Sequence, residues 1–217
     1  MRTGADRKAA ELLRQIASED VVVLRHEMSI AGKLASQAYV VEQYGFEYGE
    51  AWREGPNKQT LTVHMYRDPR PEARRREAAT IAAFPEAGNG GAVPGMQPGS
   101  LKPTAEAQEA VARLKDRIGF DVMSKGADKK QKAVAWGCCG VLVLTLLLAG
   151  MYVGALAGGA VMAAFLAGAF KLSTVRRQRL AQRLQDAGFV PVQDEHGRQR
   201  FLRPGQQLPG HANPFVG

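Results

Sequence analysis

The sequence has little of what enzymes and secreted domains usually carry. It holds only two cysteines, Cys138 and Cys139, which are adjacent and therefore cannot build a framework of disulfides. None of its four histidines stands at metal-ligand spacing from another histidine or from a cysteine. It also has no Gly-x-Ser-x-Gly motif and no glycine-rich loop that ends in Gly-Lys-Ser/Thr. The sequence therefore predicts no catalytic residue, no cofactor and no metal site, and it argues against an enzyme.

A secretory signal is also missing from the start of the sequence. Residues 1–20 are charged throughout and contain no apolar core of the length that a signal peptide needs. We therefore expect the N-terminus to stay in the cytoplasm. The richness in alanine, arginine and glycine is typical of a bacterial chain.

Charge is absent from one long segment, residues 133–170, which has no Asp, Glu, Lys or Arg. As a single α-helix this segment would be about 57 Å long, whereas the hydrocarbon core of a bilayer is about 30 Å thick. Because tilt cannot absorb a twofold excess, we predict a transmembrane hairpin with spans at about 133–150 and 154–170. The turn is expected between Gly150 and Gly154, where glycine supplies turn conformations.

The same glycines permit a second interpretation. Gly150, Gly154 and Gly158 are spaced four residues apart, so in a continuous helix they would form a stripe that lets two helices approach closely. A single span over residues 141–161 is then the alternative. In either case the small residues favour close helix packing, within the hairpin or between copies of the chain.

Basic and aromatic residues at the ends of this segment predict its orientation. We expect interfacial anchors at seven positions: Trp136, Lys129, Lys130, Lys132, Lys171, Arg176 and Arg177. Tyr152 would lie at the opposite interface. Because cytoplasmic flanks collect Lys and Arg, both termini should be cytoplasmic in a two-span cell-membrane protein. Most of the net charge of +8 that the chain carries lies in these flanks and the tail, which fits binding to anionic lipid head groups. The flanks lack the alternation of basic and aromatic residues that would favour nucleic acid.

The first 84 residues predict a soluble α+β module. Apolar residues recur at helical spacing over residues 5–17 and again over 21–43, although three consecutive valines at 21–23 leave a short strand open. Residues 44–67 alternate on both sides of a turn-rich centre and predict a β-hairpin. Pro71 suits the first turn of a further helix.

The rest of the chain divides into four parts. Residues 85–103 hold five glycines and four prolines and are expected to be a mobile linker outside any packed domain. Residues 104–132 predict a helix with a basic juxtamembrane end, and 133–170 predict the transmembrane hairpin. Residues 171–217 predict a basic helix, a small β-hairpin with its turn at 194–197, and a disordered end.

The predicted fold is thus a mainly α membrane protein, in which a helical hairpin is flanked by a small α+β cytoplasmic domain and a basic helix–β-hairpin tail. The function that this organisation favours is a membrane anchor or adaptor, which holds cytoplasmic modules at the inner leaflet for protein–protein interaction. The alternative is a self-associating protein that remodels membranes or forms pores, driven by the small-residue stripe. A membrane enzyme with an unrecognised site is the third possibility.

Overall fold

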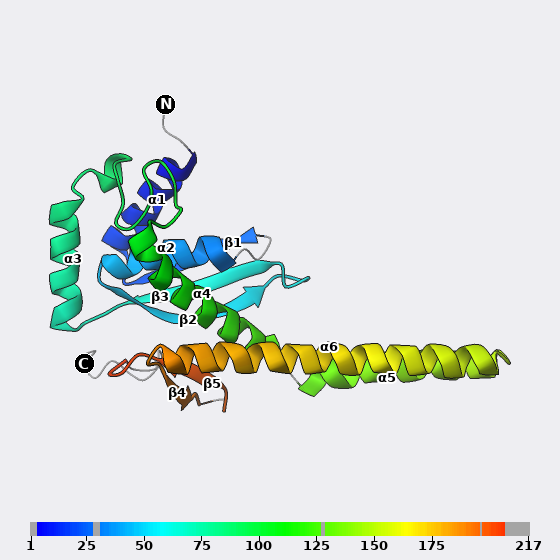
Figure 1. The fold of residues 1–217 in the computed structure, drawn as a ribbon. Helices are drawn as coiled ribbons and strands as arrows, with labels where there is room; N and C mark the ends of the chain where they lie inside the picture. Colours follow the sequence, from blue (N-terminus) through cyan, green and yellow to red (C-terminus); the bar gives the residue numbers. More distant parts are fainter. Residues whose placement is uncertain (1–3, 28–30, 127–128, 196, 207–217) are drawn as a thin grey trace.

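The computed structural model describes residues 4–27, 31–126, 129–195 and 197–206 and is a mixed α/β structure with one long helical projection (Figure 1). In chain order the elements are α1 (Gly4–Ser18), β1 (Val21–His26), α2 (Ala31–Gln43), β2 (Phe46–Glu54), β3 (Thr60–Arg67), α3 (Pro71–Ala83), the 3-10 turn η2 (Ala87–Asn89), α4 (Ala105–Gly126), α5 (Lys129–Leu148), α6 (Tyr152–Asp186), β4 (Val190–Gln193) and β5 (Gln199–Leu202).

Three strands form an antiparallel sheet in the order β1-β3-β2. The predicted hairpin over residues 44–67 is confirmed by β2 and β3, in which Ala51 lies opposite Val63. Helix α2 confirms the later part of the helix predicted over residues 21–43, whereas Val21–His26 is a strand that pairs with β3, which confirms the alternative left open for the valines at 21–23. Pairing with β3 satisfies the backbone of the β-branched valines, which favour a strand over a helix.

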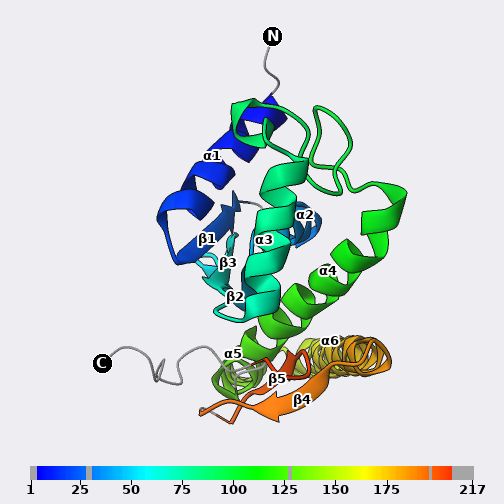
Figure 2. The ribbon, with the colours of Figure 1, turned by 90° about the vertical axis from the view of Figure 1, so that its left-hand side faces the viewer.

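The main core lies between one face of this sheet and two helices, α2 and α4, which cover it (Figure 2). The strands contribute alternate side chains such as Val22 and Met65, while Leu34 on α2 and Leu114 and Ile118 on α4 face them, all fully buried or nearly so. Alternation along a strand and three- to four-residue spacing along a helix explain which side chains enter the core. Helix α1 closes the core at one end, where Leu12 and Ile16 are buried.

The Gly/Pro-rich segment 85–103 contributes to this core, which differs from the expectation of a linker outside the packed domain. Ala87, Val93 and Met96 are buried and belong to the main apolar cluster. An isolated bridge joins Met96 to Pro103. The interpretation from composition overlooked these few apolar side chains, which hold the segment against the domain.

A second, smaller core joins the C-terminal part of the chain to α4. It contains Phe120 from α4, Leu184 from α6, and Phe189 and Phe201 beside and within the β4–β5 hairpin. The rings of Phe120 and Phe201 meet edge to face, with 4.8 Å between their centroids. The predicted C-terminal hairpin is confirmed, with β4 antiparallel to β5. The described part of the predicted tail, residues 171–195 and 197–206, therefore packs on the domain, and the predicted disordered end lies outside the described residues.

Candidate functional site: an apolar helical hairpin and its polar base

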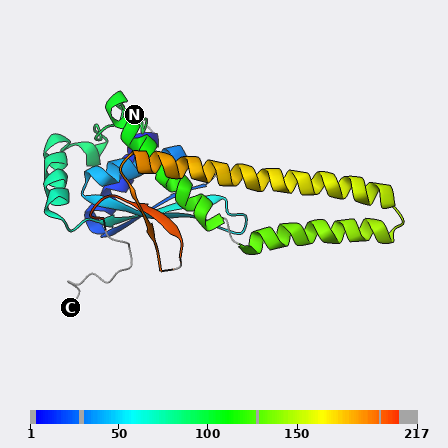
Figure 3. The same cartoon turned by 60° about the horizontal axis from the view of Figure 1, so that its bottom comes forward.

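The uncharged segment turns back on itself between two long helices (Figure 3). Helix α5 ends at Leu148, and α6 begins at Tyr152. The backbone N–H groups of Gly150 and Met151 donate to the carbonyls of Leu147 and Leu146. Gly150 has φ +76°, in the left-handed region that glycine occupies without a Cβ penalty. The turn is shorter than the predicted 150–154, and it leaves Tyr152 and Gly154 inside α6.

Small residues line the contact between the two helices. On α6, Ala155 is buried and Gly159 and Ala163 are partly buried, as are Leu166 and Phe170 further along; Ala155, Gly159 and Ala163 are spaced four residues apart and so share one helix face. A Cβ built on Gly159 would lie only 2.9 Å from Cγ2 of Val143 on α5. The two helices can therefore approach closely at this point only because residue 159 has no side chain.

The predicted stripe of Gly150, Gly154 and Gly158 does not lie in this contact. No atom lies within 4 Å of a Cβ built on Gly158, and the nearest atom to one on Gly154 is the tip of Met151 at 3.9 Å. The small residues that contact α5 instead include Gly159, one position after Gly158. Helical periodicity shows that a stripe of small residues exists but not which of two adjacent stripes faces the partner helix.

The outer surface of the hairpin is apolar and open. Leu148 is 82% exposed and Val153 is 83% exposed, and Leu156, Val161 and Phe165 are each at least 70% exposed. An exposed apolar surface of this extent marks contact with a membrane or another protein. By length and composition α6 could cross a membrane, while the apolar part of α5, Ala133–Leu148, is shorter.

The predicted interfacial residues lie along the hairpin and at its base. Trp136 is 46% exposed near the start of α5, and Tyr152 is exposed as the first residue of α6. Lys171 and Arg176 are exposed on α6, whereas the guanidinium of Arg177 lies over the ring of Phe120, 5.3 Å from its centroid. The side chains of Lys129, Lys130 and Lys132 lie outside the described part of the chain. Cys138 is exposed and Cys139 is partly covered on α5.

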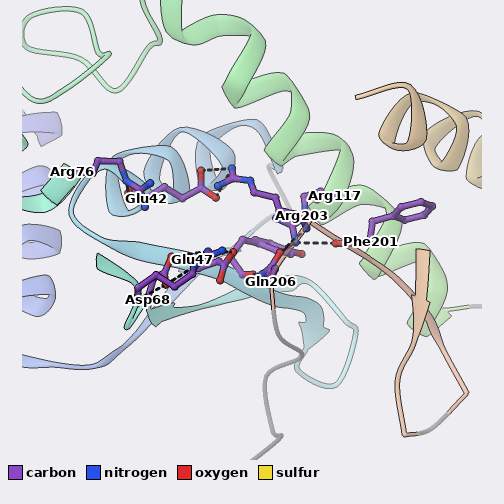
Figure 4. A network of polar contacts seen from close by, with 10 residues as sticks. Glu42, Glu47, Asp68, Arg76, Arg117, Phe201, Arg203 and Gln206 are labelled. Carbon is purple, nitrogen blue, oxygen red and sulfur yellow. Dashed lines mark hydrogen bonds and ion pairs between the residues drawn. The ribbon is translucent and has the colours of Figure 1, made fainter. Parts of the chain in front are cut away.

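Beyond its apolar part, α6 returns the chain to the domain that α4 belongs to, and there a buried polar junction holds it (Figure 4). Its centre is Arg117 of α4, which is 2% exposed. The guanidinium lies between two aromatic rings, 4.4 Å from the centroid of Tyr48 and 4.9 Å from that of Phe189. Its Nη2 donates to the carbonyl of Phe201 and to Oε1 of Gln206. Contacts between a desolvated cation and aromatic faces are worth about 2 kcal/mol.

Two further arginines from the C-terminal segment reach into the domain. Arg203 donates to both carboxylate oxygens of Glu42 on α2, at 2.8 and 3.0 Å. Arg200 donates to the carbonyl of Gly49 at 2.8 Å and lies 3.6 Å from Asp121 on α4. These bonds tie the end of the described chain to α2, β2 and α4.

A second ion-pair cluster continues the junction toward α3. Arg70 donates to Asp68 at 2.7 Å and to Glu47 on β2 at 3.0 Å. Although burial opposes the change, hydrogen bonds from Arg70 lower the pKa of Asp68 below its usual range. Burial raises the pKa of Glu47, and Arg70 offsets only part of this effect.

Burial also sets the ionisation of the central groups. It raises the pKa of Asp121, although Arg200 and a hydrogen bond from the Tyr48 hydroxyl favour the charged carboxylate. Burial likewise raises the pKa of Tyr48, and the nearby Asp121 raises it further. It lowers the pKa of Arg117. Removing a cation from water is costly unless contacts replace hydration. Because Nε and Nη1 of Arg117 have no hydrogen-bond partner, its charge depends on the two bonds of Nη2 and on the two aromatic rings.

The polar junction connects segments on both sides of the hairpin. It closes a ring in which the chain leaves the domain through α4, forms the apolar hairpin, and returns through α6 to bonds with that same domain. Among the described residues no cluster of three or more His, Cys, Asp or Glu side chains could hold a metal ion. Sequence analysis missed Arg117, Arg200 and Arg203, because their partners are far away in the sequence and no local spacing reveals them.

Comparison with known proteins gives no relative: no family model matches the chain, and neither a curated protein nor a solved structure is significantly similar to it.

Proposed function

We propose that this protein is an integral membrane anchor or adaptor whose hairpin crosses the bilayer twice and holds the soluble domain at the inner leaflet for binding to another protein. The observation that carries the proposal is the open apolar surface of α5 and α6, which projects from a domain with its own buried core. In water such a surface would aggregate, whereas in lipid it would be solvated.

The dimensions of the two helices support two crossings. At about 1.5 Å per residue, the apolar part of α5 is about 24 Å long, and residues 152–170 of α6 are about 28 Å long. Both lengths are close to the hydrocarbon thickness of about 30 Å. The turn at Gly150 would then lie at the far interface, with Tyr152 beside it.

The polar junction supports the placement of both soluble parts on one side. Arg117, Arg200 and Arg203 join segments that precede and follow the hairpin, so a membrane cannot separate them without breaking these bonds. The basic residues at the base, including Lys171 and Arg176, then favour the cytoplasmic side. Both termini of the chain would then lie on the cytoplasmic side.

Reporter fusions at residues 1 and 217 test the topology, and a pulldown from mild detergent tests the adaptor role. We expect cytoplasmic signals from both fusions and the recovery of one dominant partner protein. An external C-terminus would contradict the two crossings. Recovery of the chain alone, together with leakage of liposomes that contain it, would contradict the adaptor role and favour a pore.

A further inference from the structure

The structure assigns a second membrane contact to the turn between β2 and β3, where Arg53 and Lys58 would bind the anionic head groups of the leaflet that the hairpin enters. This inference rests on the proposed function, because it takes α5 and α6 to be in the bilayer. Both side chains are exposed, and they flank the exposed turn residues 55–57.

The soluble domain has a defined orientation relative to the hairpin. Helix α6 is continuous from Tyr152 to Asp186, so the apolar part and the part that packs on the domain belong to one rigid element. Its far end is held by Leu184 in the second core and by Leu180, which packs against it. A flexible tether would let any face of the domain meet the membrane, whereas this helix selects one.

The turn between β2 and β3 lies on the selected face. It points in the direction in which the hairpin projects and reaches the level at which α5 begins, and both views agree on this (Figures 1 and 3). Helix α3 lies at the opposite end of the domain in the same views. With the apolar hairpin in the hydrocarbon region, the turn is at the depth of the head groups.

Local contacts hold the strand ends beside the turn, and the turn carries basic side chains. Trp52 donates its ring N–H to Glu54 at 2.7 Å, and its ring contacts that of His64 at a tilt of 58°, with 4.4 Å between ring centroids. Glu54 also lies 3.9 Å from Arg25 on β1. Glu54 therefore has cationic and N–H neighbours, and the exposed side chains of Arg53 and Lys58 add two positive charges at the turn.

The experiment uses the full chain in vesicles of phosphatidylcholine and phosphatidylglycerol, with Cys138→Ser and Cys139→Ser to remove the native thiols. A fluorophore is attached through Asn57→Cys in the turn or, as the control, through Ala79→Cys on α3. Quenching is measured with a nitroxide near the carbonyl end of an acyl chain, carried either by phosphatidylglycerol or by phosphatidylcholine. Insertion is checked separately by resistance to alkaline extraction.

We expect severalfold stronger quenching at position 57 than at 79, and stronger quenching by the anionic lipid than by the neutral one. Each basic residue near an anionic surface gains about 1 kcal/mol, or about a fivefold enrichment of the anionic lipid. Arg53→Glu with Lys58→Glu should abolish the preference for the anionic lipid. The matched reversal on α3, Arg74→Glu with Arg75→Glu, should leave it unchanged.

Three results would overturn the inference. An inserted chain with equal quenching at positions 57 and 79 would show that the turn stays away from the leaflet, and it would leave the proposed function intact. Equal quenching by the two lipids would show that Arg53 and Lys58 do not bind anionic head groups. Extraction of the chain by alkali would show that it is not inserted in the bilayer, and this would contradict both the inference and the proposed function.

Discussion

Replacement of Gly159 by isoleucine should separate the two helices of the hairpin, while the same replacement of Gly158 should not. A Cβ at position 159 would lie 2.9 Å from Cγ2 and 3.9 Å from Cγ1 of Val143, whereas nothing lies within 4 Å of a Cβ at position 158. The two positions are adjacent in the same helix, so both variants make the same change in helix propensity and apolarity. Their difference isolates the contact with α5.

The magnitude follows from the cost of overpacking. Val143 is branched at Cβ and has few alternative rotamers that would avoid the new side chain. The helices must therefore move apart, or the backbone must shift. Extra atoms in a packed interior cost about 1–3 kcal/mol. A cost of about 1 kcal/mol, the low end of that range, would lower the equilibrium constant for closure of the hairpin about fivefold. Gly159→Ala should also weaken closure of the hairpin, but by a smaller factor.

Intramolecular cross-linking provides the assay. The contact of residue 159 with Val143 sets the register of the antiparallel pair, and this register puts Cys139 opposite Ala163. A chain with Cys138→Ser and Ala163→Cys therefore carries a thiol pair across the interface, and its oxidation yield in membranes reports closure. We expect a severalfold lower yield with Gly159→Ile and an unchanged yield with Gly158→Ile.

The reasoning would be refuted by equal yields from the two variants. It would also be refuted if Gly158→Ile lowered the yield more than Gly159→Ile, because the stripe of Gly150, Gly154 and Gly158 would then face α5.

Four further predictions concern the turn, the polar junction and one exposed ion pair. Gly150→Val should lower the same cross-linking yield, because φ +76° costs a β-branched residue about 1–2 kcal/mol. Arg203→Ala should destabilise the domain by about 2 kcal/mol in denaturant unfolding, since it leaves the buried Glu42 unpaired while Arg203 itself is half-exposed. Arg183→Ala, at an exposed pair, should change stability by less than about 1 kcal/mol. Because burial raises the pKa of Asp121, its protonated form favours folding, so this group should add stability as the pH falls through that raised pKa. Asp121→Asn should reduce this slope and leave the part that Glu47 contributes, because burial also raises the pKa of Glu47.

Two outcomes would contradict these predictions. An unchanged midpoint with Arg203→Ala would mean that Glu42 finds another partner or enough water. The same dependence of stability on pH in the native chain and in Asp121→Asn would mean that Asp121 does not contribute to it.

Much of the local structure could be predicted from the sequence because the signals are local. The helix from Pro71, the β2–β3 hairpin and the β4–β5 hairpin each follow from spacing and turn residues within a short window. The break near Gly150 follows from the length of the uncharged segment compared with the length of a helix that crosses a bilayer.

The rest depends on contacts between distant segments. The valines at 21–23 form a strand because β3, about forty residues later, pairs with them. Met96 packs in the core although its segment has the composition of a linker. Arg117 and Phe201 are partners across the whole length of the hairpin, and no period in the sequence connects them.

The central claim is that the hairpin crosses the membrane and returns, and the accessibility of its apex tests this most directly. Met151→Cys, in a chain with Cys138→Ser and Cys139→Ser, puts one thiol in the exposed turn between α5 and α6. Asn57→Cys in the same background puts one in the soluble domain. With a membrane-impermeant maleimide on intact cells, we predict labelling of position 151 from outside and labelling of position 57 only after permeabilisation. Labelling of both positions from the same side, or protection of position 151 from both sides, would contradict two crossings.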